Sequence, residues 1–314
     1  MESEFRQDLV SKDWVLIAAG RASRPHAPRP RADNYQNPEN CPFEHTTVAV
    51  EVIKNDFPAV AHGACGPIME HDGYQITAGV GMHELFIFKD HERQLYDFSV
   101  QEMGDVIKAY RTRYQEIAKL DNCGQYIMIF NNYGREGGAS IYHPHSQIIS
   151  MPIIPPDVAR SLRGSYDYFK KHGTEAHGVM IEKELANEKR IIFENEQFVA
   201  FCPYVSKYPY EMRIYPKYAN GHFDQIEDQS LTPLSETLTA VLKKMHTALG
   251  DPAYNFFIHT APLHYEKSDL SFDHYYSWHI EILPRVSFDA GFEAGTGIKI
   301  NIIDPDLAAQ TLNG

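Results

Sequence analysis

The segment HPHSQIISM, residues 143–151, decides how this chain is interpreted. Side chains two residues apart on an extended strand point to the same side, so His143 and His145 are expected to share a face. The apolar residues that follow are typical of a strand entering a core. The preceding run NNYGREGGAS, residues 131–140, is rich in glycine, which leaves backbone amides free to bind phosphate. Together the two segments predict an imidazole nucleophile beside a phosphate-binding loop.

The pattern around this strand recurs in the second half of the chain. Each half contains a strand, a helix and two further strands in the same order. The predicted elements lie at residues 83–88, about 99–118, 126–131 and 143–151, then at 211–215, 232–249, 254–259 and 278–285. This repetition predicts an α+β fold of two tandem, pseudo-duplicated units, each an antiparallel sheet with helices. We expect the units to span residues 1–175, including an N-terminal arm, and residues 176–314.

The bulk composition argues against several classes of function. The 314 residues are enough for a large core, and the formal net charge of −13 argues against general nucleic-acid binding, which requires a basic surface. The four cysteines form no Cys-x-x-Cys pair, which indicates a reduced, cytoplasmic protein. A charged N-terminal segment and the lack of an apolar run of about 20 residues predict no secretion signal and no membrane partner.

With the HPH strand, the glycine loop and the duplication established, the sequence resembles the galactose-1-phosphate uridylyltransferase family. This family belongs to the histidine-triad (HIT) superfamily, and the resemblance implies a HIT-like fold for each unit. Its marks extend over nearly the whole chain, at residues 14–17, 20–25, 41–43, 55–57, 130–134, 140–147 and 290–293.

The resemblance implies a ping-pong exchange through a covalent nucleotidyl-histidine. His145 matches the nucleophile, which attacks the α-phosphorus of a nucleotide sugar and releases a sugar 1-phosphate. Neutral imidazole is nucleophilic near pH 7 if one ring nitrogen is free, so the other needs an acceptor. We expect that acceptor to be a carbonyl of the glycine loop. Gln147 matches the residue that donates to a phosphate oxygen in the intermediate and in the transition state.

The resemblance also implies a set of substrate-binding residues. Those matched to the phosphates, the nucleoside and the hexose are Arg21, Arg24, Asn55, Asp56, Phe57, Asn132, Gly138, Ser140 and Glu293. The segment around Glu293 departs from the best-known members: Ser287 stands where a basic residue is expected, and residues 291–301 resemble a branch that includes ADP-glucose phosphorylase. The nucleotide base and the acceptor therefore stay open.

Two metal sites of the family can be compared with this sequence. For the first, Cys41, Glu44, His91 and His143 take the ligand positions, with Glu44 in place of a second cysteine, and this set can bind zinc tetrahedrally. For the second, His259 and His279 match two ligands, but Ser161 replaces an acidic ligand and Glu281 a histidine, so we expect no metal there. We also expect Glu281 to occupy the place that His145 holds in the first unit.

Several readings of the function remain. The leading one transfers UMP between UDP-hexose and hexose 1-phosphate, and the second applies the same chemistry to ADP-glucose and inorganic phosphate. Hydrolysis of nucleotides is disfavoured, because hydrolytic relatives usually carry histidine at the position of Gln147. A non-catalytic nucleotide-binding protein is disfavoured because His145 is present. The expected partners are a nucleotide sugar, a sugar 1-phosphate and a second copy in a homodimer.

Overall fold

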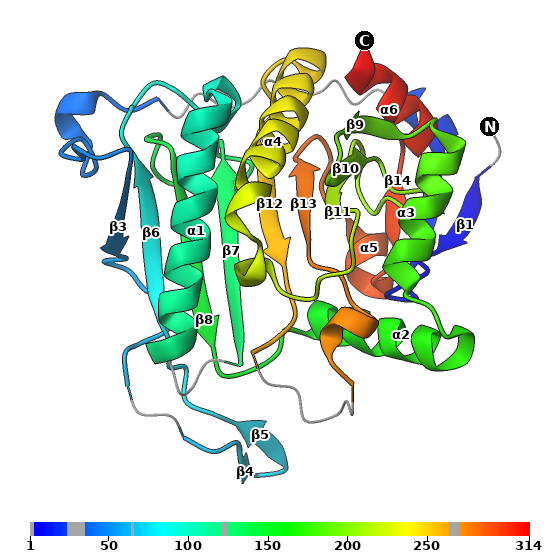
Figure 1. The fold of residues 1–314 in the computed structure, drawn as a ribbon, viewed down its shortest axis with the longest axis horizontal. Coiled ribbons are helices and arrows are strands. Elements are labelled where there is room, and N and C mark those ends of the chain that lie inside the picture. Colours follow the sequence, from blue (N-terminus) through cyan, green and yellow to red (C-terminus); the bar gives the residue numbers. More distant parts are fainter. Residues whose placement is uncertain (1–2, 24–34, 64–65, 121–124, 264–269) are drawn as a thin grey trace.

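A nine-stranded antiparallel sheet organises the protein, with strands in the order β3-β6-β8-β7-β12-β13-β11-β10-β9 (Figure 1). The structure is a computed structural model and describes residues 3–23, 35–63, 66–120, 125–263 and 270–314. The strands of this sheet are β3 (Val50–Lys54), β6 (His83–Phe88), β7 (Tyr126–Tyr133), β8 (His145–Met151), β9 (Ile191–Glu194), β10 (Phe198–Phe201), β11 (Met212–Pro216), β12 (Tyr254–His259) and β13 (His279–Pro284).

The duplication is visible in the strand order. Strands β3-β6-β8-β7 run from one edge to the centre, and β10-β11-β13-β12 repeat that order from the other side. The halves meet where β7 pairs with β12 in antiparallel fashion, with Phe130 opposite Phe257. The α+β class and the HIT-like duplication are thus confirmed. The boundary between residues 175 and 176 stays a prediction, and the two halves share one continuous sheet.

Helices α1 (Val100–Leu120) and α4 (Asp228–Leu249) pack side by side on one face of the sheet (Figure 1). They cover a common apolar core with side chains such as Ile129, Ile148 and Ile280. Because strand side chains alternate, His145, Gln147 and their neighbours on the other strands point to the opposite face. The face opposite α1 and α4 therefore carries His145 and Gln147.

The two long helices begin differently. At α1 a capping box is present: the Ser99 hydroxyl accepts from the Glu102 amide at 3.3 Å, and Glu102 accepts from the Ser99 amide at 2.8 Å. Helix α4 begins at Asp228, four residues before the predicted start at residue 232, so Pro233 lies inside it. A proline there removes one helical N–H, yet the Pro233 carbonyl still accepts from the Thr237 hydroxyl at 2.8 Å.

The first and last segments of the chain meet in a small second sheet. Strands β1 (Glu4–Gln7), β2 (Trp14–Ile17) and β14 (Lys299–Asn301) form it, and β14 runs parallel to β2. The remaining elements are the hairpin β4 (Met69–His71) and β5 (Tyr74–Ile76), and the helices α2 (Pro156–His172), α3 (Ala176–Asn187), α5 (Gly291–Thr296) and α6 (Pro305–Asn313). The N-terminal arm is therefore packed against the C-terminal half.

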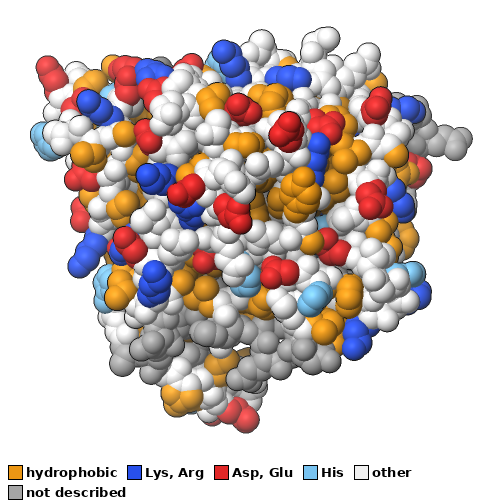
Figure 2. Space-filling model, in the orientation of Figure 1, with side chains coloured by type: hydrophobic (Ala, Val, Ile, Leu, Met, Phe, Trp, Pro, Cys, Tyr) orange, Lys and Arg blue, Asp and Glu red, His pale blue; other side chains and the backbone are white. Residues whose placement is uncertain are grey.

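The surface is consistent with the composition. On the helix-covered face, acidic and basic side chains are interspersed, and the described residues form no continuous basic strip there (Figure 2). Within the described part of the chain, no helix combines the length and apolarity needed to cross a bilayer.

Candidate active site

His145 is the first residue of β8 and points to the face without α1 and α4. Its side chain is largely buried, 7% exposed, and burial lowers the pKa of the imidazole, which favours the neutral form. The ring Nδ1 lies 2.8 Å from the backbone oxygen of His143. A carbonyl can only accept, so Nδ1 carries the hydrogen and Nε2 keeps its lone pair. Among the described residues, Nε2 has no hydrogen-bond partner.

The backbone acceptor differs from the predicted one. We expected a carbonyl of the glycine loop, whereas the acceptor is the carbonyl of His143, two residues earlier on the same segment. Pro144 lies between the two histidines. The backbone of His145 is also fixed by Asn131, whose side-chain amide donates to the His145 carbonyl at 2.8 Å. Orientation of the nucleophile is thus a local property of the HPH segment.

The glycine loop lies directly between β7 and β8 and requires its glycines. A side chain at Gly137 would come within 2.2 Å of the Tyr133 carbonyl oxygen, and Gly138 has a φ of +85°. Any other residue at position 137 would clash with the backbone, and any other residue at position 138 would strain it. Ser140 is exposed at the end of the loop. Asn132, the last-but-one residue of β7, lies next to Gly138, as the phosphate-binding prediction requires.

Gln147 is linked to the predicted nucleoside segment through a histidine that sequence reasoning missed. His83, at the start of β6, places Nε2 2.9 Å from Gln147 Oε1 and Nδ1 3.0 Å from the backbone nitrogen of Ala59. Asn55 Nδ2 lies 3.3 Å from the same His83 Nε2. Asp56 and Phe57 are exposed beside them, Phe57 at 91%. An exposed aromatic ring of this kind is available to stack on a base.

Two predicted residues of the described part of the chain, Arg21 and Glu293, show no contact with this site. Arg21 is exposed on the short helix Ala19–Ser23, and no contact between described residues joins it to His145. Glu293 accepts from the Ala290 amide at 2.9 Å and so caps α5. Arg24 lies outside the described residues. The roles of these three residues stay predictions.

The four predicted metal ligands converge behind the nucleophile. Atoms of Cys41, Glu44, His91 and His143 all lie within 4.8 Å of one another. Nδ1 of His143 is 3.6 Å from Cys41 Sγ, 3.1 Å from His91 Nδ1 and 3.8 Å from Glu44 Oε2. Burial raises the pKa of the Cys41 thiol and lowers the pKa of His143, while Glu44 closes the cluster from the exposed side.

The ring orientations show that this cluster fits a cation. Nε2 of His143 donates to the Phe88 carbonyl at 2.5 Å, and Nε2 of His91 donates to the Gln36 carbonyl at 2.8 Å. In the neutral rings both Nδ1 atoms then present lone pairs to each other, which is unfavourable unless a proton or a metal ion lies between them. Backbone carbonyls that fix the outer nitrogen are the usual support of metal-binding histidines. The group can therefore hold a metal ion.

The second half carries a related but different arrangement around His279. This residue opens β13 as His145 opens β8, and its Nδ1 lies 3.2 Å from the carbonyl of Ser277, again two residues earlier. By these two criteria the counterpart of His145 is His279, and Glu281 corresponds to Gln147. The prediction that Glu281 takes the nucleophile's place is therefore wrong by two residues, because residue spacing alone left the register of the repeat undetermined.

His279 is placed among groups that prevent it from acting as a nucleophile. Its Nε2 lies 3.4 Å from Glu281 Oε1, and its ring stacks on His259 and on Tyr215 with centroid distances of 5.0 and 4.7 Å. Burial lowers its pKa to about 3. Glu281 in turn lies 3.2 Å from Arg213 Nε, and this guanidinium holds the pKa of Glu281 well below its usual range.

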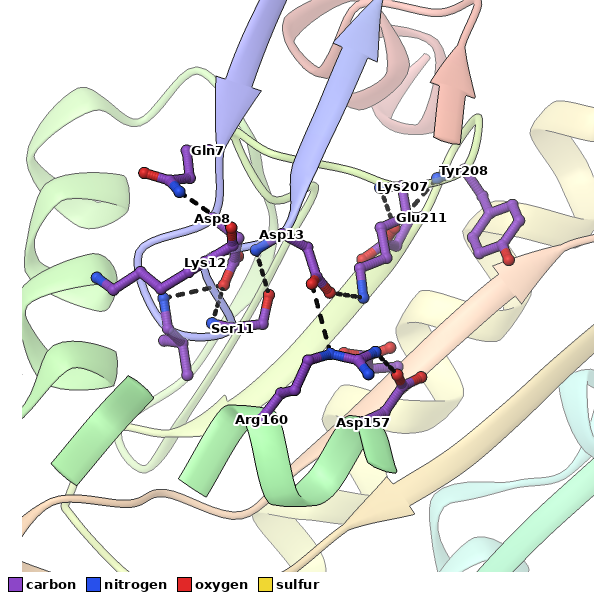
Figure 3. Close-up of polar contacts among 12 residues, drawn as sticks. Gln7, Asp8, Ser11, Lys12, Asp13, Asp157, Arg160, Lys207, Tyr208 and Glu211 are labelled. Carbon is purple, nitrogen blue, oxygen red and sulfur yellow. Dashed lines mark hydrogen bonds and ion pairs between the residues drawn. The ribbon is translucent and has the colours of Figure 1, made fainter. Parts of the chain in front are cut away.

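The same arginine ties the second half to the N-terminal arm. Arg213 pairs with Glu211 at 2.7 Å, and Glu211 accepts from the backbone amides of Lys207 and Tyr208. Lys207 then pairs with Asp13 at 2.9 Å, and Asp13 also lies 3.5 Å from Arg160 on α2 (Figure 3). The charged groups that surround Glu281 are thus structural partners of one another.

Comparisons with known proteins agree with this geometry. The family profile of the galactose-1-phosphate uridyl transferase N-terminal domain matches residues 5–155, and a domain of unknown function (DUF4921) matches residues 87–312. The chain is 32% identical to an ADP-glucose phosphorylase of Arabidopsis thaliana over 98% of its length and 92% of that protein. It is 25% identical to a galactose-1-phosphate uridylyltransferase of Thermotoga maritima over 98% of its length and 97% of that protein.

Solved structures give the same result. A crystal structure of an ADP-glucose phosphorylase from Arabidopsis thaliana with bound ADP-glucose superposes with a TM-score of 0.83 at 30% identity, covering 100% of this chain and 98% of that one. A uridylyltransferase structure superposes with a TM-score of 0.79 at 26% identity, covering 99% and 97% of the two chains.

Proposed function

Because the chain belongs to the galactose-1-phosphate uridylyltransferase family of nucleotidyltransferases, we propose that His145 forms a covalent nucleotidyl intermediate with the nucleotide of ADP-glucose. One observation carries this proposal: Nε2 of His145 keeps a lone pair on the face of the sheet opposite α1 and α4, in a hollow shared with the glycine loop, while Nδ1–H is held by a carbonyl. The full-length similarity to ADP-glucose phosphorylase favours adenine as the base.

The proposed reaction has two steps. Nε2 of His145 attacks the α-phosphorus of ADP-glucose, the bond from that phosphorus to the bridging oxygen breaks, and glucose 1-phosphate leaves. AMP then remains on His145, and the imidazolium keeps its Nδ1–H on the His143 carbonyl. Inorganic phosphate attacks the same phosphorus, which releases ADP and restores the neutral ring. Gln147, Asn132 and the loop amides would donate to the phosphate oxygens as negative charge develops.

A second donor, UDP-hexose with a hexose 1-phosphate acceptor, is supported by the family profile over residues 5–155.

The experiment is to incubate the protein separately with ADP-glucose and UDP-glucose labelled at the α-phosphate, and to measure acid-labile label on the protein. We expect label from ADP-glucose, its return as ADP on adding phosphate, and none in His145→Ala. Label from UDP-glucose alone would reassign the donor, and label from neither would overturn the proposal.

For the metal site we propose zinc, held by Cys41, Glu44, His91 and His143. The donor set of thiolate, carboxylate and two imidazoles suits zinc, and a site closed by four protein ligands is structural. When bound, the ion would link the segment around Cys41 to the strand that carries His145. The homodimer and the cytoplasmic location remain predictions.

A further inference from the structure

Two side chains outside the predicted site, His83 and Asn255, contact the side-chain oxygens of Gln147 and Asn132, which are predicted to bind phosphate through their amino groups. His83 on β6 contacts Gln147 on β8, and Asn255 on β12 contacts Asn132 on β7. An amide side chain can present either its oxygen or its amino group, and the two differ in sign toward a phosphate. What holds each amide in one orientation therefore matters for binding an anion.

The orientation of Gln147 follows from a backbone group. The Ala59 amide can only donate, so Nδ1 of neutral His83 accepts from it at 3.0 Å and Nε2 carries the hydrogen. The Gln147 atom 2.9 Å from that Nε2 must then be the acceptor, Oε1. In the opposite tautomer, with the hydrogen on Nδ1, Nε2 could accept from Asn55 Nδ2 at 3.3 Å. The Nδ1–H would then face the Ala59 N–H, and the hydrogen bond to Gln147 Oε1 would be lost. The amino group of Gln147 is thus turned away from His83.

The orientation of Asn132 follows in the same way. Asn255 Nδ2 lies 2.6 Å from the Gly137 carbonyl oxygen, which can only accept, so this atom is the amino group of Asn255. The same nitrogen donates to Asn132 Oδ1 at 2.8 Å. The amino group of Asn132 is left on the side of the glycine loop, where a Cβ added to Gly138 would lie 3.9 Å from Nδ2. Asn255 comes from the second half of the duplication.

We propose that His83 and Asn255 are positioning residues that hold Gln147 and Asn132 with both amino groups toward the phosphates. This inference rests on the proposed nucleotidyl transfer and adds its donor geometry. An anion entering the site then meets hydrogen-bond donors without paying for amide reorientation, which is how preorganised sites stabilise developing charge. It also gives the second half a role in the first half's reaction, since Asn255 acts across the β7–β12 junction.

The His83 claim can be tested with two substitutions of opposite expected effect. The polar atoms of asparagine reach the place of Nδ1, whereas glutamine can bring an N–H near the place of Nε2. At saturating labelled nucleotide sugar, we expect His83→Asn to slow labelling of His145 by up to about 100-fold, the lower end of the range found when one such donor is removed outright, and His83→Gln to stay within about threefold. His71→Asn, on the exposed hairpin, is the matched control. Wild-type labelling by His83→Asn, or equal loss in both variants, would overturn the claim.

For Asn255 the informative change is Asn255→Asp. A carboxylate only accepts, so Asn132 would rotate its amino group toward position 255 and present oxygen to the phosphate. We expect labelling at saturating donor to slow at least about tenfold while the melting temperature stays within a few degrees, with the exposed Asn187→Asp as control. Unchanged labelling contradicts the role of Asn255.

The proposed function and this inference fail in distinguishable ways. If wild-type protein is labelled and the variants at His83 and Asn255 are labelled at the same rate, only the inference is refuted. If wild-type protein takes no label from either nucleotide sugar, the proposed function fails, and the orientation is judged by NMR of the Gln147 side-chain amide, identified with Gln147→Ala. A shifted amide signal in His83→Asn but not in His83→Gln supports the inference, and identical spectra reject it.

Discussion

His145 and His279 each open a strand near the centre of the sheet, and each turns Nδ1 toward the carbonyl two residues earlier. They differ in what lies at Nε2. No described residue hydrogen-bonds to that atom of His145, whereas Glu281 lies 3.4 Å from that atom of His279 and two aromatic rings stack on the imidazole. The comparison teaches that the fold supplies the same oriented imidazole twice, and that its neighbours decide whether it can react.

The largest expected effect separates the two histidines by labelling. His145→Ala should reduce formation of the nucleotidyl-protein by at least about a thousandfold, because a missing nucleophile removes the covalent step. His279→Gln should leave labelling per folded molecule within about threefold. Labelling is measured by rapid quench, with circular dichroism to count folded protein. Equal loss in both variants would show that the halves are not as different as their geometry indicates.

Next in size is the buried ion pair that surrounds Glu281. Strand pairing places Arg213 opposite Glu281, and the corresponding partner of Gln147 is the apolar Leu85. Arg213→Leu should lower the free energy of unfolding by about 3–5 kcal/mol, because it leaves two buried carboxylates without their cation. Adding Glu281→Gln should recover part of that loss. Urea denaturation measures both, and a single variant as stable as wild type would contradict the structural role.

Metal binding should distinguish the halves as well. We expect purified protein to contain about one equivalent of zinc, and free zinc at 100 times its Kd to stabilise the protein by about 2.7 kcal/mol. Cys41→Ser should lose that stabilisation, and His259→Ala should keep the zinc content. Elemental analysis and thermal melts give the result; less than about a tenth of an equivalent in wild-type protein would exclude a zinc site.

Acid should act on the second half through His279. Its pKa is about 3 in the folded protein and about 6.5 when unfolded, so the unfolded state takes up a proton first as the pH falls. The stability is complete above pH 6.5 and decreases toward pH 3, by up to about 1.4 kcal/mol per pH unit. His279→Gln should show a correspondingly flatter dependence in urea titrations between pH 4 and 7. Parallel curves for the two proteins would mean that His279 is not buried in neutral form.

The smallest expected effect concerns the first turns of α1 and α4. Ser99→Ala should cost about 1 kcal/mol, because it removes the cap of α1. Glu227, which precedes α4, makes no capping hydrogen bond with its side chain, so Glu227→Ser should stabilise the protein by up to a similar amount. Both changes can be measured by thermal unfolding. A destabilising Glu227→Ser would show that α4 depends on packing at this end.

Much of the site could be predicted from sequence because its residues are local or match a known pattern. The HPH strand, the glycine loop and the convergence of Cys41, Glu44, His91 and His143 were predicted, as were three strands of each half, whereas β3, β9 and β10 were not. The predicted start of α4 was wrong by four residues, because proline is usually found in the first turn of a helix and Pro233 lies in the second. The partner of His145 Nδ1 and the register of the second half were also wrong, since both depend on backbone positions that side-chain identity does not encode.

The sequence by itself determined the HPH strand, the glycine loop and the order of the main strands and helices, and it predicts His145 and Gln147 as the catalytic residues. The tertiary structure decided that His83 contacts the side-chain amide of Gln147 and that Asn255 contacts that of Asn132. The partners are 64 and 123 residues apart in the sequence. The physical reason is that the period of a strand or helix is set within a few neighbouring residues, whereas contacts across strands depend on register. Register in turn is set by packing of the whole sheet against α1 and α4.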